Sequence, residues 1–299
     1  MATAIEDTRR GISSAAPVRR SGKDPASMRT FNIICAVVLI VFALLWVLPD
    51  LWALYTSLNQ NSVASLGAGP LLRHPSFTLH SYVSLFQQGN ILNWYLASFV
   101  TSIITVVLTI LSASMAAFAL SRMTFRGKNA VFFLVLAGIM IPGQVLIVPW
   151  FREFNALHLL NTYWAVILPQ VPSAVAVFVF KQFFDGLPRE LEESSRVDGA
   201  GFWTIYRSII MPLTRPAVAA VSIFTFVWTW NNLLWPLLAL SNPKLMTIPV
   251  GLATVQGSYG QRVADIMATS ILGALPLIIL FLFFQRRIIE GIAGTGLKG

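Results

Sequence analysis

The sequence predicts an all-α membrane protein with six transmembrane helices, and two observations carry that prediction. Hydrophobic residues make up 56% of the 299 residues and charged residues only 11%, whereas about a quarter of a soluble domain is charged. The chain also contains six apolar runs of about 20 residues, the length that a helix needs to cross a bilayer. The alternating pattern of a membrane β-barrel is absent, so these runs are expected to be helices whose backbone groups bond within the segment.

The six predicted spans are separated by polar loops. They cover residues 31–55, 94–120, 130–150, 163–184, 217–240 and 266–284. Prolines lie inside the last four of them, at Pro142, Pro149, Pro169, Pro172, Pro236 and Pro276. A proline frees a backbone carbonyl in a membrane helix and is tolerated where neighbouring helices or a water-filled cavity satisfy that group. These four spans are therefore expected to be kinked.

The basic residues predict the orientation of the spans. Of the 21 Lys and Arg residues, seventeen lie in residues 1–30, in the loops after the second and fourth spans, and after the sixth span; the opposite side holds four. Flanking Lys and Arg favour the cytoplasmic side. Both termini, the loop 185–216 and the C-terminal tail 287–299 are thus predicted to be cytoplasmic, and the loop 59–93 external. Topology accounts for the net charge of +9, so no nucleic-acid partner is predicted.

Residues 1–30 and 31–299 are expected to behave differently. The first segment is basic and rich in Ser and Ala without apolar periodicity, which predicts a disordered cytoplasmic tail close to anionic headgroups. The second segment is expected to form one transmembrane domain in the plasma membrane.

Side chains within the spans are small or apolar rather than ionisable. Asp50 lies near the outer end of the first span, and nothing charged lies in the middle of the other five. This scarcity argues against a proton-coupled pump, a voltage sensor or an intramembrane hydrolase, each of which needs buried titratable groups. In the second span, small residues recur at a spacing of four, which predicts close helix contacts: Ser98 with Ser102 and Ala113 with Ala117.

The sequence predicts no catalytic, metal or nucleotide site on this chain. The three histidines, His74, His80 and His158, lie in predicted external loops without metal-ligand spacing. The string from Gly294 to Gly299 has the spacing G-x-G-x-x-G, but it follows a membrane helix rather than a strand. A phosphate-binding G-x-x-x-x-G-K-[ST] string is missing. Energy for any active transport would therefore come from another subunit.

The acidic segment between the fourth and fifth spans is the strongest candidate for a functional site. Residues 185–200 carry seven charged side chains and cannot lie in lipid. Pro188 suits the start of a helix whose first turn holds three glutamates that complement its dipole. Asp198-Gly199 ends that helix, and an apolar stripe follows at residues 202–209. The pattern predicts a protruding helix–turn–helix, although a solvated amphipathic connector fits the composition nearly as well.

The order of residues in this segment resembles a known family. Glu193-Ser-Ser-Arg-Val-Asp-Gly199 followed by Ile209-Ile-Met-Pro212 is similar to the EAA loop of binding-protein-dependent ABC importer permeases, with Ser194, Ser195 and Met211 as departures from its pattern. Over most of residues 31–299 the chain looks like the carbohydrate branch, and most like the MalG-like second permease of maltose-type importers. The strings that carry this likeness are Asn161-Thr162, Trp230-Asn231-Asn232, Trp235-Pro236, Thr247-Ile-Pro249-Val-Gly251-Leu and the ending from Gln285 to Gly299.

The resemblance implies the fold of a type I ABC importer transmembrane domain and the role of a permease subunit. Such a subunit forms half of the path for a sugar that an external binding protein delivers. It is not an enzyme and holds no cofactor, because ATP and Mg belong to a partner ATPase. The implied partners are a second permease, two copies of the ATPase subunit, the external solute-binding protein, the lipid bilayer and the carbohydrate.

The resemblance also implies which residues touch the ATPase. The tail is similar to one that reaches the ATPase dimer interface, which gives Lys298 and Gly299 a contact. The loop forms a coupling helix that docks on the ATPase, with the contacts Glu192, Glu193, Ser194, Ser195, Asp198, Gly199, Ala200 and Pro212.

Amide and aromatic side chains in the spans are candidates for a sugar path. Sugars present hydroxyls and apolar ring faces, so amides and aromatic rings suit them better than charges. Interfacial tryptophans form belts in most membrane proteins, and asparagine can simply bond a neighbouring helix, so packing is the competing interpretation. The candidates are Gln144, Gln170, Trp228, Trp230, Asn231 and Asn232.

Other functions remain compatible with the sequence. A glycerol-phosphate importer of related type would share the loop and the spans. A membrane enzyme acting on lipid-linked sugar would need carboxylates or histidines near the interface, such as Asp50, His74 or His80. A non-transporting scaffold would show no substrate-dependent stimulation of an ATPase.

Overall fold

The computed structural model describes residues 25–59, 76–87, 90–258 and 263–296. The predicted tail contacts Lys298 and Gly299 lie outside these residues, as do most of the predicted basic tail and residues 60–75 of the predicted external loop. The chain divides into two compact units, residues 1–51 and 52–299.

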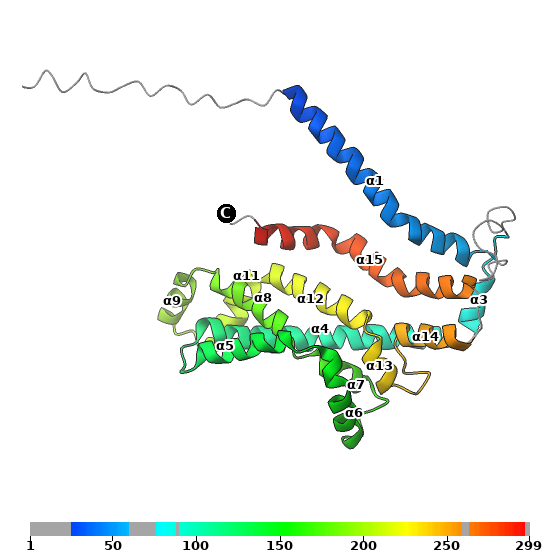
Figure 1. The fold of residues 1–299 in the computed structure, drawn as a ribbon. Helices are drawn as coiled ribbons and strands as arrows, with labels where there is room; N and C mark the ends of the chain where they lie inside the picture. The colour runs from blue at the N-terminus through cyan, green and yellow to red at the C-terminus, as the bar shows by residue number, and fades with distance from the viewer. Residues whose placement is uncertain (1–24, 60–75, 88–89, 259–262, 297–299) are drawn as a thin grey trace, which may run out of the picture. The chain divides into compact units, whose positions relative to one another are not determined.

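The described residues are helical and contain no β-strand, only an isolated bridge between Asn59 and Phe77. The all-α prediction is therefore confirmed for this part of the chain. The α-helices of eight or more residues are α1 (Pro25–Ser57), α3 (His80–Gln87), α4 (Ile91–Arg122), α5 (Lys128–Ala137), α6 (Ile147–Ala156), α8 (Ala174–Asp185), α9 (Glu190–Val197), α12 (Arg215–Trp230), α14 (Ile248–Ser258) and α15 (Val263–Gly296) (Figure 1). Shorter elements join them: the 3₁₀ turns η1 (Gly138–Met140), η2 (Gly143–Leu146) and η3 (Leu168–Gln170), the π-helix η4 (Tyr206–Ile210), and α7 (Tyr163–Ile167), α10 (Phe202–Ile205), α11 (Met211–Leu213) and α13 (Leu234–Ala239).

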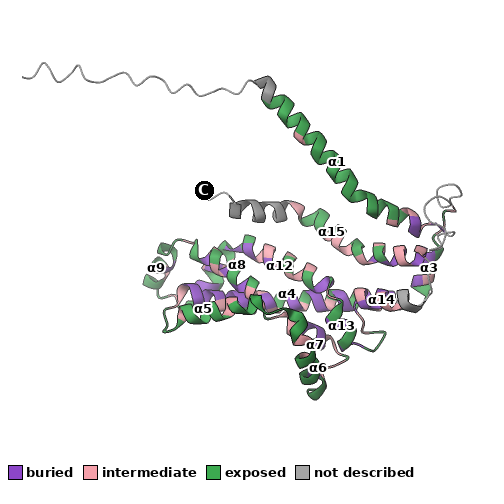
Figure 2. Ribbon diagram, in the orientation of Figure 1, coloured by how far each residue is buried: buried purple, intermediate pink, exposed green. Residues whose placement is uncertain are grey.

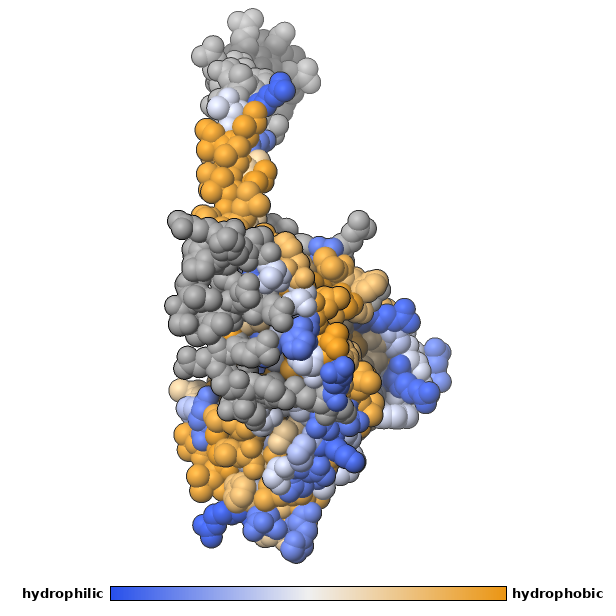
Figure 3. Space-filling model, turned by 90° about the vertical axis from the view of Figure 1, so that its right-hand side faces the viewer, coloured by the Kyte–Doolittle hydropathy of each residue, from blue (hydrophilic) through white to orange (hydrophobic). Residues whose placement is uncertain are grey.

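The first unit consists of most of α1. Its side chains are exposed along nearly the whole helix, among them large apolar ones such as Trp46 (Figure 2). Apolar residues cover most of its visible surface in Figure 3. A helix that is hydrophobic on all sides needs an apolar surrounding, and the 30 residues from Met28 to Ser57 are long enough to cross a bilayer. The helix begins already at Pro25, within the segment predicted as a tail, and proline suits the first helical position.

Among the described residues, three helices are continuous and apolar enough to span a membrane, and three bent pairs bring the number up to six if each pair is one span. The continuous helices cover Met28–Ser57, Ile91–Arg122 and Val263–Gln285. The bent pairs turn by 90° between Met140 and Gly143, by 47° between Gln170 and Ala174, and by 78° at Thr214. The kinks predicted from the prolines of the third and fourth spans are thus sharp breaks.

Proline and a neighbouring helix together produce these breaks. Ile141, before Pro142, is extended (φ −85°, ψ 114°), because a proline ring disfavours the helical conformation in the preceding residue. At the second break, the carbonyl of Val171 accepts a hydrogen bond from Thr109 Oγ1 of α4 at 3.2 Å. The irregular backbone is therefore satisfied within the protein, as an apolar surrounding demands.

The fifth predicted span, residues 217–240, is not one helix. Helix α12 ends at Trp230, and α13 begins only at Leu234. Pro236 has no N–H to donate to the carbonyl four residues before it, so the helix cannot continue through Asn232 with all its bonds. The 78° turn at Thr214 also makes α10, η4 and α11 the partners of α12 in a bent pair.

The core of the second unit lies around α4, which packs against α8 and α12 along its length (Figure 1). The four small residues that predicted close helix contacts, Ser98, Ser102, Ala113 and Ala117, are all buried. Ala113 and Ala117 belong to a cluster with Phe180, Phe184 and other apolar residues of the neighbouring helices. Small side chains allow the backbones to approach closely, so this prediction is confirmed.

Helix α14 lies outside every predicted span and packs against α4 and α15. The backbone N–H of Ile248 donates to Ser98 Oγ at 2.8 Å. Gly251 faces Trp94, because a Cβ built on it would lie 2.2 Å from Trp94 Cδ2. Trp94 is itself held by a hydrogen bond of 2.7 Å from Nε1 to the carbonyl of Pro243. Helix α14 is thus attached to the first turns of α4.

We expect Gly251→Ala to destabilise the protein. The Trp94 ring cannot move away without losing its bond to Pro243, so the overlap should cost about 1–3 kcal/mol of unfolding free energy. The measurement is the midpoint of thermal aggregation in detergent. Gly138→Ala is the matched control, since a Cβ there meets no atom within 4 Å. Equal midpoints for the two variants would contradict the close approach of α14 to α4.

Candidate functional site

The acidic segment forms a helix–turn–helix at one end of α4 (Figure 1). Helix α8 ends at Asp185, α9 runs over Glu190–Val197, and α10, η4 and α11 follow the turn as far as Leu213. Three glutamates stand in the first turn of α9 and Arg196 in its last turn, an order that favours the helix dipole at both ends. The predicted local structure is therefore present.

The turn between α9 and α10 depends on Gly199. This residue has a φ of +81°, a conformation that glycine adopts without steric cost. Its N–H donates to Arg196 O at 3.0 Å, and the N–H of Ala200 donates to Ser195 O at 2.9 Å. A left-handed glycine with such bonds is a common end of a helix. A Cβ would meet no atom within 4 Å, so the backbone conformation alone accounts for the need for glycine.

One face of the helix–turn–helix is open. Most predicted contact residues are exposed, namely Glu193, Ser194, Asp198, Gly199 and Pro212, while Ser195 and Ala200 are half-buried. Sequence reasoning missed Val197, which is 88% exposed at the end of α9. The sequence feature that could have identified Val197 is its apolar side chain in a mainly polar segment. Val197 thus adds an apolar side chain to the exposed, mainly polar face of α9.

The opposite face of α9 packs against α4 through Glu192, which is buried, unlike the exposed residues of the first face. Its Oε1 lies 2.9 Å from Nε of Arg122, the last residue of α4, and the two side chains are 8% and 3% exposed. Nη2 of Arg122 also donates to the carbonyls of Phe184 and Leu187, the latter at 3.0 Å. Sequence reasoning did not single out Arg122, because its partners lie more than 60 residues further along the chain.

The second arm of the helix–turn–helix also contacts α4. Tyr206 OH and Ser114 Oγ are 2.8 Å apart in a hydrogen bond, and the Tyr206 ring meets the edge of Phe118 with centroids 5.4 Å apart. Tyr206 lies in the π-helix η4, an uncommon element often found at functional sites. Both arms therefore pack on the same helix.

The predicted path residues do not share one environment. Trp228 is 76% exposed, whereas Trp230 is 1% exposed, stacks on Phe226 and donates from Nε1 to Gly273 O at 3.1 Å. Gln144 and Asn231 are exposed, and Gln170 and Asn232 are half-buried.

Both glutamines lie beside the breaks of bent helix pairs. Gln144 lies in η2 at the 90° break, and Gln170 ends η3 at the 47° break. Nε2 of Gln170 donates to Val166 O at 2.8 Å, while its buried Oε1 has no partner among the described residues. The amides thus stand where the helices are interrupted.

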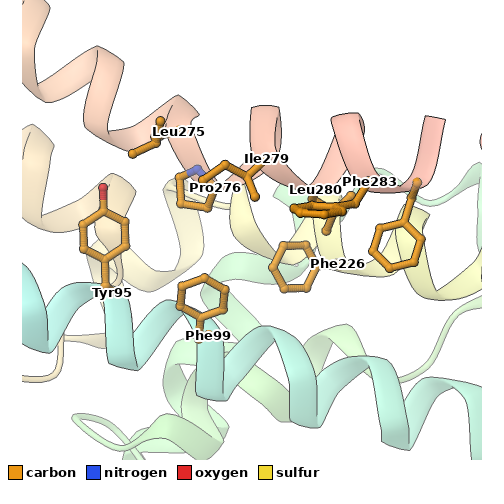
Figure 4. Close-up of a pocket in the computed structure, with 9 residues that line it drawn as sticks. Tyr95, Phe99, Phe226, Leu275, Pro276, Ile279, Leu280 and Phe283 are labelled. Atoms are coloured by element: carbon orange, nitrogen blue, oxygen red, sulfur yellow. The ribbon is translucent and has the colours of Figure 1, made fainter.

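A cavity of about 380 Å³ opens between α4, α12 and α15 (Figure 4). Its lining is apolar and aromatic, and the hydroxyl of Tyr95 is already bonded to Leu272 O at 2.6 Å. The cavity therefore offers no free polar group and none of the predicted path residues. It is lined by Tyr95, Phe99, Phe226, Leu275, Pro276, Ile279, Leu280, Phe283 and Phe284.

Metal ligands do not gather in the described part of the chain, where no three His, Cys, Asp or Glu side chains are placed to hold an ion. The helix–turn–helix and the interrupted helices are therefore the candidate sites.

Comparison with known proteins gives one family. Residues 109–288 match the family described as the binding-protein-dependent transport system inner membrane component. The chain is 39% identical over 246 residues, 82% of its own length and 86% of the relative's, to the arabinooligosaccharides transport system permease protein AraQ of Halalkalibacterium halodurans. It is 29% identical to the maltodextrin transport system permease protein MdxG of Bacillus subtilis, covering 92% of this chain and 99% of that one.

A solved structure shows the same fold. A chain of a bacterial ABC transporter involved in the import of the acidic polysaccharide alginate superposes with a TM-score of 0.73. The superposition covers 87% of this chain and 97% of that chain, at 21% identity. The fold implied by the EAA-like string is therefore confirmed.

Gly199→Ala should loosen the turn after α9. Forcing alanine into the left-handed region costs about 1 kcal/mol, which corresponds to about fivefold faster local opening. Hydrogen–deuterium exchange at the amides of residues 198–201 measures this. Gly201→Ala is the matched control, because Gly201 has a φ of −77° and room for a Cβ. Similar exchange in both variants would show that the turn does not depend on Gly199.

Proposed function

The chain belongs to the family of binding-protein-dependent transport system inner membrane components, and from that premise we propose that it is a permease subunit of an ATP-driven sugar importer. It forms half of the path through the membrane, together with a second permease subunit. A solute-binding protein outside the membrane delivers the sugar. Two copies of a cytoplasmic ATPase subunit hold ATP and Mg and drive the cycle.

The observation that carries this proposal is the open face of α9 and its turn, which lies inside the segment that matches the family. The face combines Glu193 and Asp198 with the exposed Val197. An apolar anchor surrounded by charged residues suits docking in a groove of another protein. We assign this face to the ATPase, with Ser194, Ser195, Gly199, Ala200 and Pro212 around it and Glu192 behind it.

Six crossings with both termini in the cytoplasm complete the proposal. The three continuous helices and three bent pairs supply six spans when each pair crosses once. The distribution of Lys and Arg supports the orientation. In the proposed orientation the α9 end of α4 lies in the cytoplasm, where the ATPase works, and the α14 end lies outside.

The cargo we propose is an oligosaccharide. The relatives named above serve arabinooligosaccharides and maltodextrin, and the spans offer amides and rings rather than charges. Among the path candidates, the exposed or half-buried ones are placed to meet a sugar: Gln144, Gln170, Trp228, Asn231 and Asn232. Trp230 supports them from the core through its stacking on Phe226.

The coupling role is tested with the chain co-expressed with its second permease and ATPase subunits. Glu193→Lys and Val197→Asp should each lower the amount of ATPase that co-purifies, because hot-spot truncations cost about 2 kcal/mol or more of binding free energy. Glu153→Lys is the matched control, an exposed glutamate on α6. Unchanged co-purification in both α9 variants would refute docking of the ATPase on this face.

The path role is tested by sugar uptake in proteoliposomes. Asn231→Ala should reduce uptake about tenfold, since a lost hydrogen bond of about 1–1.5 kcal/mol has that effect, while assembly with the ATPase persists. Asn129→Ala, an exposed amide on α5, should leave uptake unchanged. Equal uptake in the two variants would remove Asn231 from the path. The sugar used is the one that binds the cognate solute-binding protein.

A further inference from the structure

We infer that Arg122 is the positioning residue that transmits movement of α9 to the membrane helices, through its buried ion pair with Glu192. This inference rests on the proposed function, because it concerns how the docking face acts once an ATPase moves it. The residues that touch the partner and the residues that pass the movement on are then different sets, on opposite faces of α9.

The geometry of Arg122 is that of a clamp. Its Nε lies 2.9 Å from the Glu192 carboxylate, while Nη2 donates to the carbonyls of Phe184 and Leu187. One planar guanidinium thus joins the end of α4 to α9 and to the chain between α8 and α9. Nε and the carboxylate meet at ion-pair distance without hydrogen-bond alignment, so charge attraction holds this contact. A lysine could not hold the three sites together, because its ammonium is a single point.

Burial distinguishes this pair from the other ion pair of the described residues. Arg122 and Glu192 are almost fully enclosed, and removing one partner would leave an uncompensated buried charge, which strongly favours keeping the two together. Lys181 and Asp185 pair within α8 and are partly exposed, and exposed pairs contribute little. Both members of the Lys181 pair lie in α8, so the pair itself does not join α9 to α4. Arg122 with Glu192 is therefore the contact that resists separation of α9 from α4.

A second contact makes the attachment rigid. Tyr206 of η4 bonds Ser114 and packs on Phe118. Ser114 and Arg122 are eight residues apart on α4, about 12 Å along the helix. Two contacts about 12 Å apart resist pivoting of the helix–turn–helix on α4 better than one contact does, so we expect its movement to carry α4 along.

The far end of α4 holds α14 through Trp94 against Gly251 and through Ser98 to Ile248. Figure 1 shows α9 and α14 at opposite ends of α4. The 32 residues of α4 span about 48 Å at 1.5 Å per residue. A contiguous set of packed elements therefore joins the docking face to α14, and coupling between distant sites can be carried along such a set.

The experiment uses the complete complex in proteoliposomes. Cys35→Ser removes the native thiol, and Lys244→Cys carries a spin label in the exposed link before α14. Three quantities are measured: ATP hydrolysis, sugar uptake per ATP hydrolysed, and the change in label mobility when a non-hydrolysable ATP analogue is added.

Arg122→Lys and Glu192→Gln should keep ATP hydrolysis while uptake per ATP falls about fivefold to tenfold, within the range by which mutations modulate coupling. The change in label mobility caused by the ATP analogue should become smaller in the same variants. Tyr206→Phe, which removes only the bond to Ser114, should give a smaller fall and keeps the test valid if Arg122→Lys fails to assemble. Arg126→Lys, an exposed arginine in the loop after α4, is the matched control and should match the wild type.

Unchanged uptake per ATP and an unchanged label response in Arg122→Lys and Glu192→Gln would overturn the clamp and leave the proposed function intact. A wild-type complex that hydrolyses ATP but takes up no sugar would overturn the proposed function and the clamp with it. The wild type is therefore measured first.

Discussion

The packing of α4 is the interaction on which the rest of the second unit depends. Its buried residues are mostly Ser, Thr and Ala, so neighbouring backbones approach closely and also find hydroxyl partners. Thr109 bonds the carbonyl freed at the break before α8, Ser98 accepts from the start of α14, and Arg122 donates to the end of α8. In an apolar surrounding each unsatisfied backbone group would cost several kcal/mol. The interrupted helices around α4 are stable because α4 supplies these partners.

The sequence predicted the continuous helices and the breaks in the third and fourth spans, but not the angles of these breaks. Residues 91–122 and 263–285 could be recognised because run length and hydropathy belong to the segment itself. Pro142 and Pro172 mark interruptions for the same local reason. Whether the chain then turns by 90° or by 47° depends on distant partners such as Thr109. Helix α14 was missed because eleven residues are too few to span a bilayer, and its burial comes from Trp94.

For the candidate site, too, the sequence predicted the local structure but not which side chains are exposed and which are buried. The order from Glu193 to Gly199 and Pro212 was sufficient to predict the turn and to name an exposed face. It could not separate Glu192 from Glu193, because one step along a helix rotates a side chain by about 100°. Trp228 and Trp230 pose the same difficulty on α12, where one is exposed and the other buried. Residue type limits what a side chain can do, but only the packing of the helix shows which of two similar residues is buried and which is exposed.

The two faces of α9 answer different physical demands. The exposed face meets water when unbound, so its charges are well solvated and binding there can be weak and reversible. The buried face holds a charge pair that water does not reach, which is costly to separate. The docking role proposed for α9 needs both properties, since a partner would have to be released while the link to the membrane helices holds. Eight residues suffice because adjacent glutamates on a helix point in different directions: Glu193 is exposed and Glu192 faces Arg122.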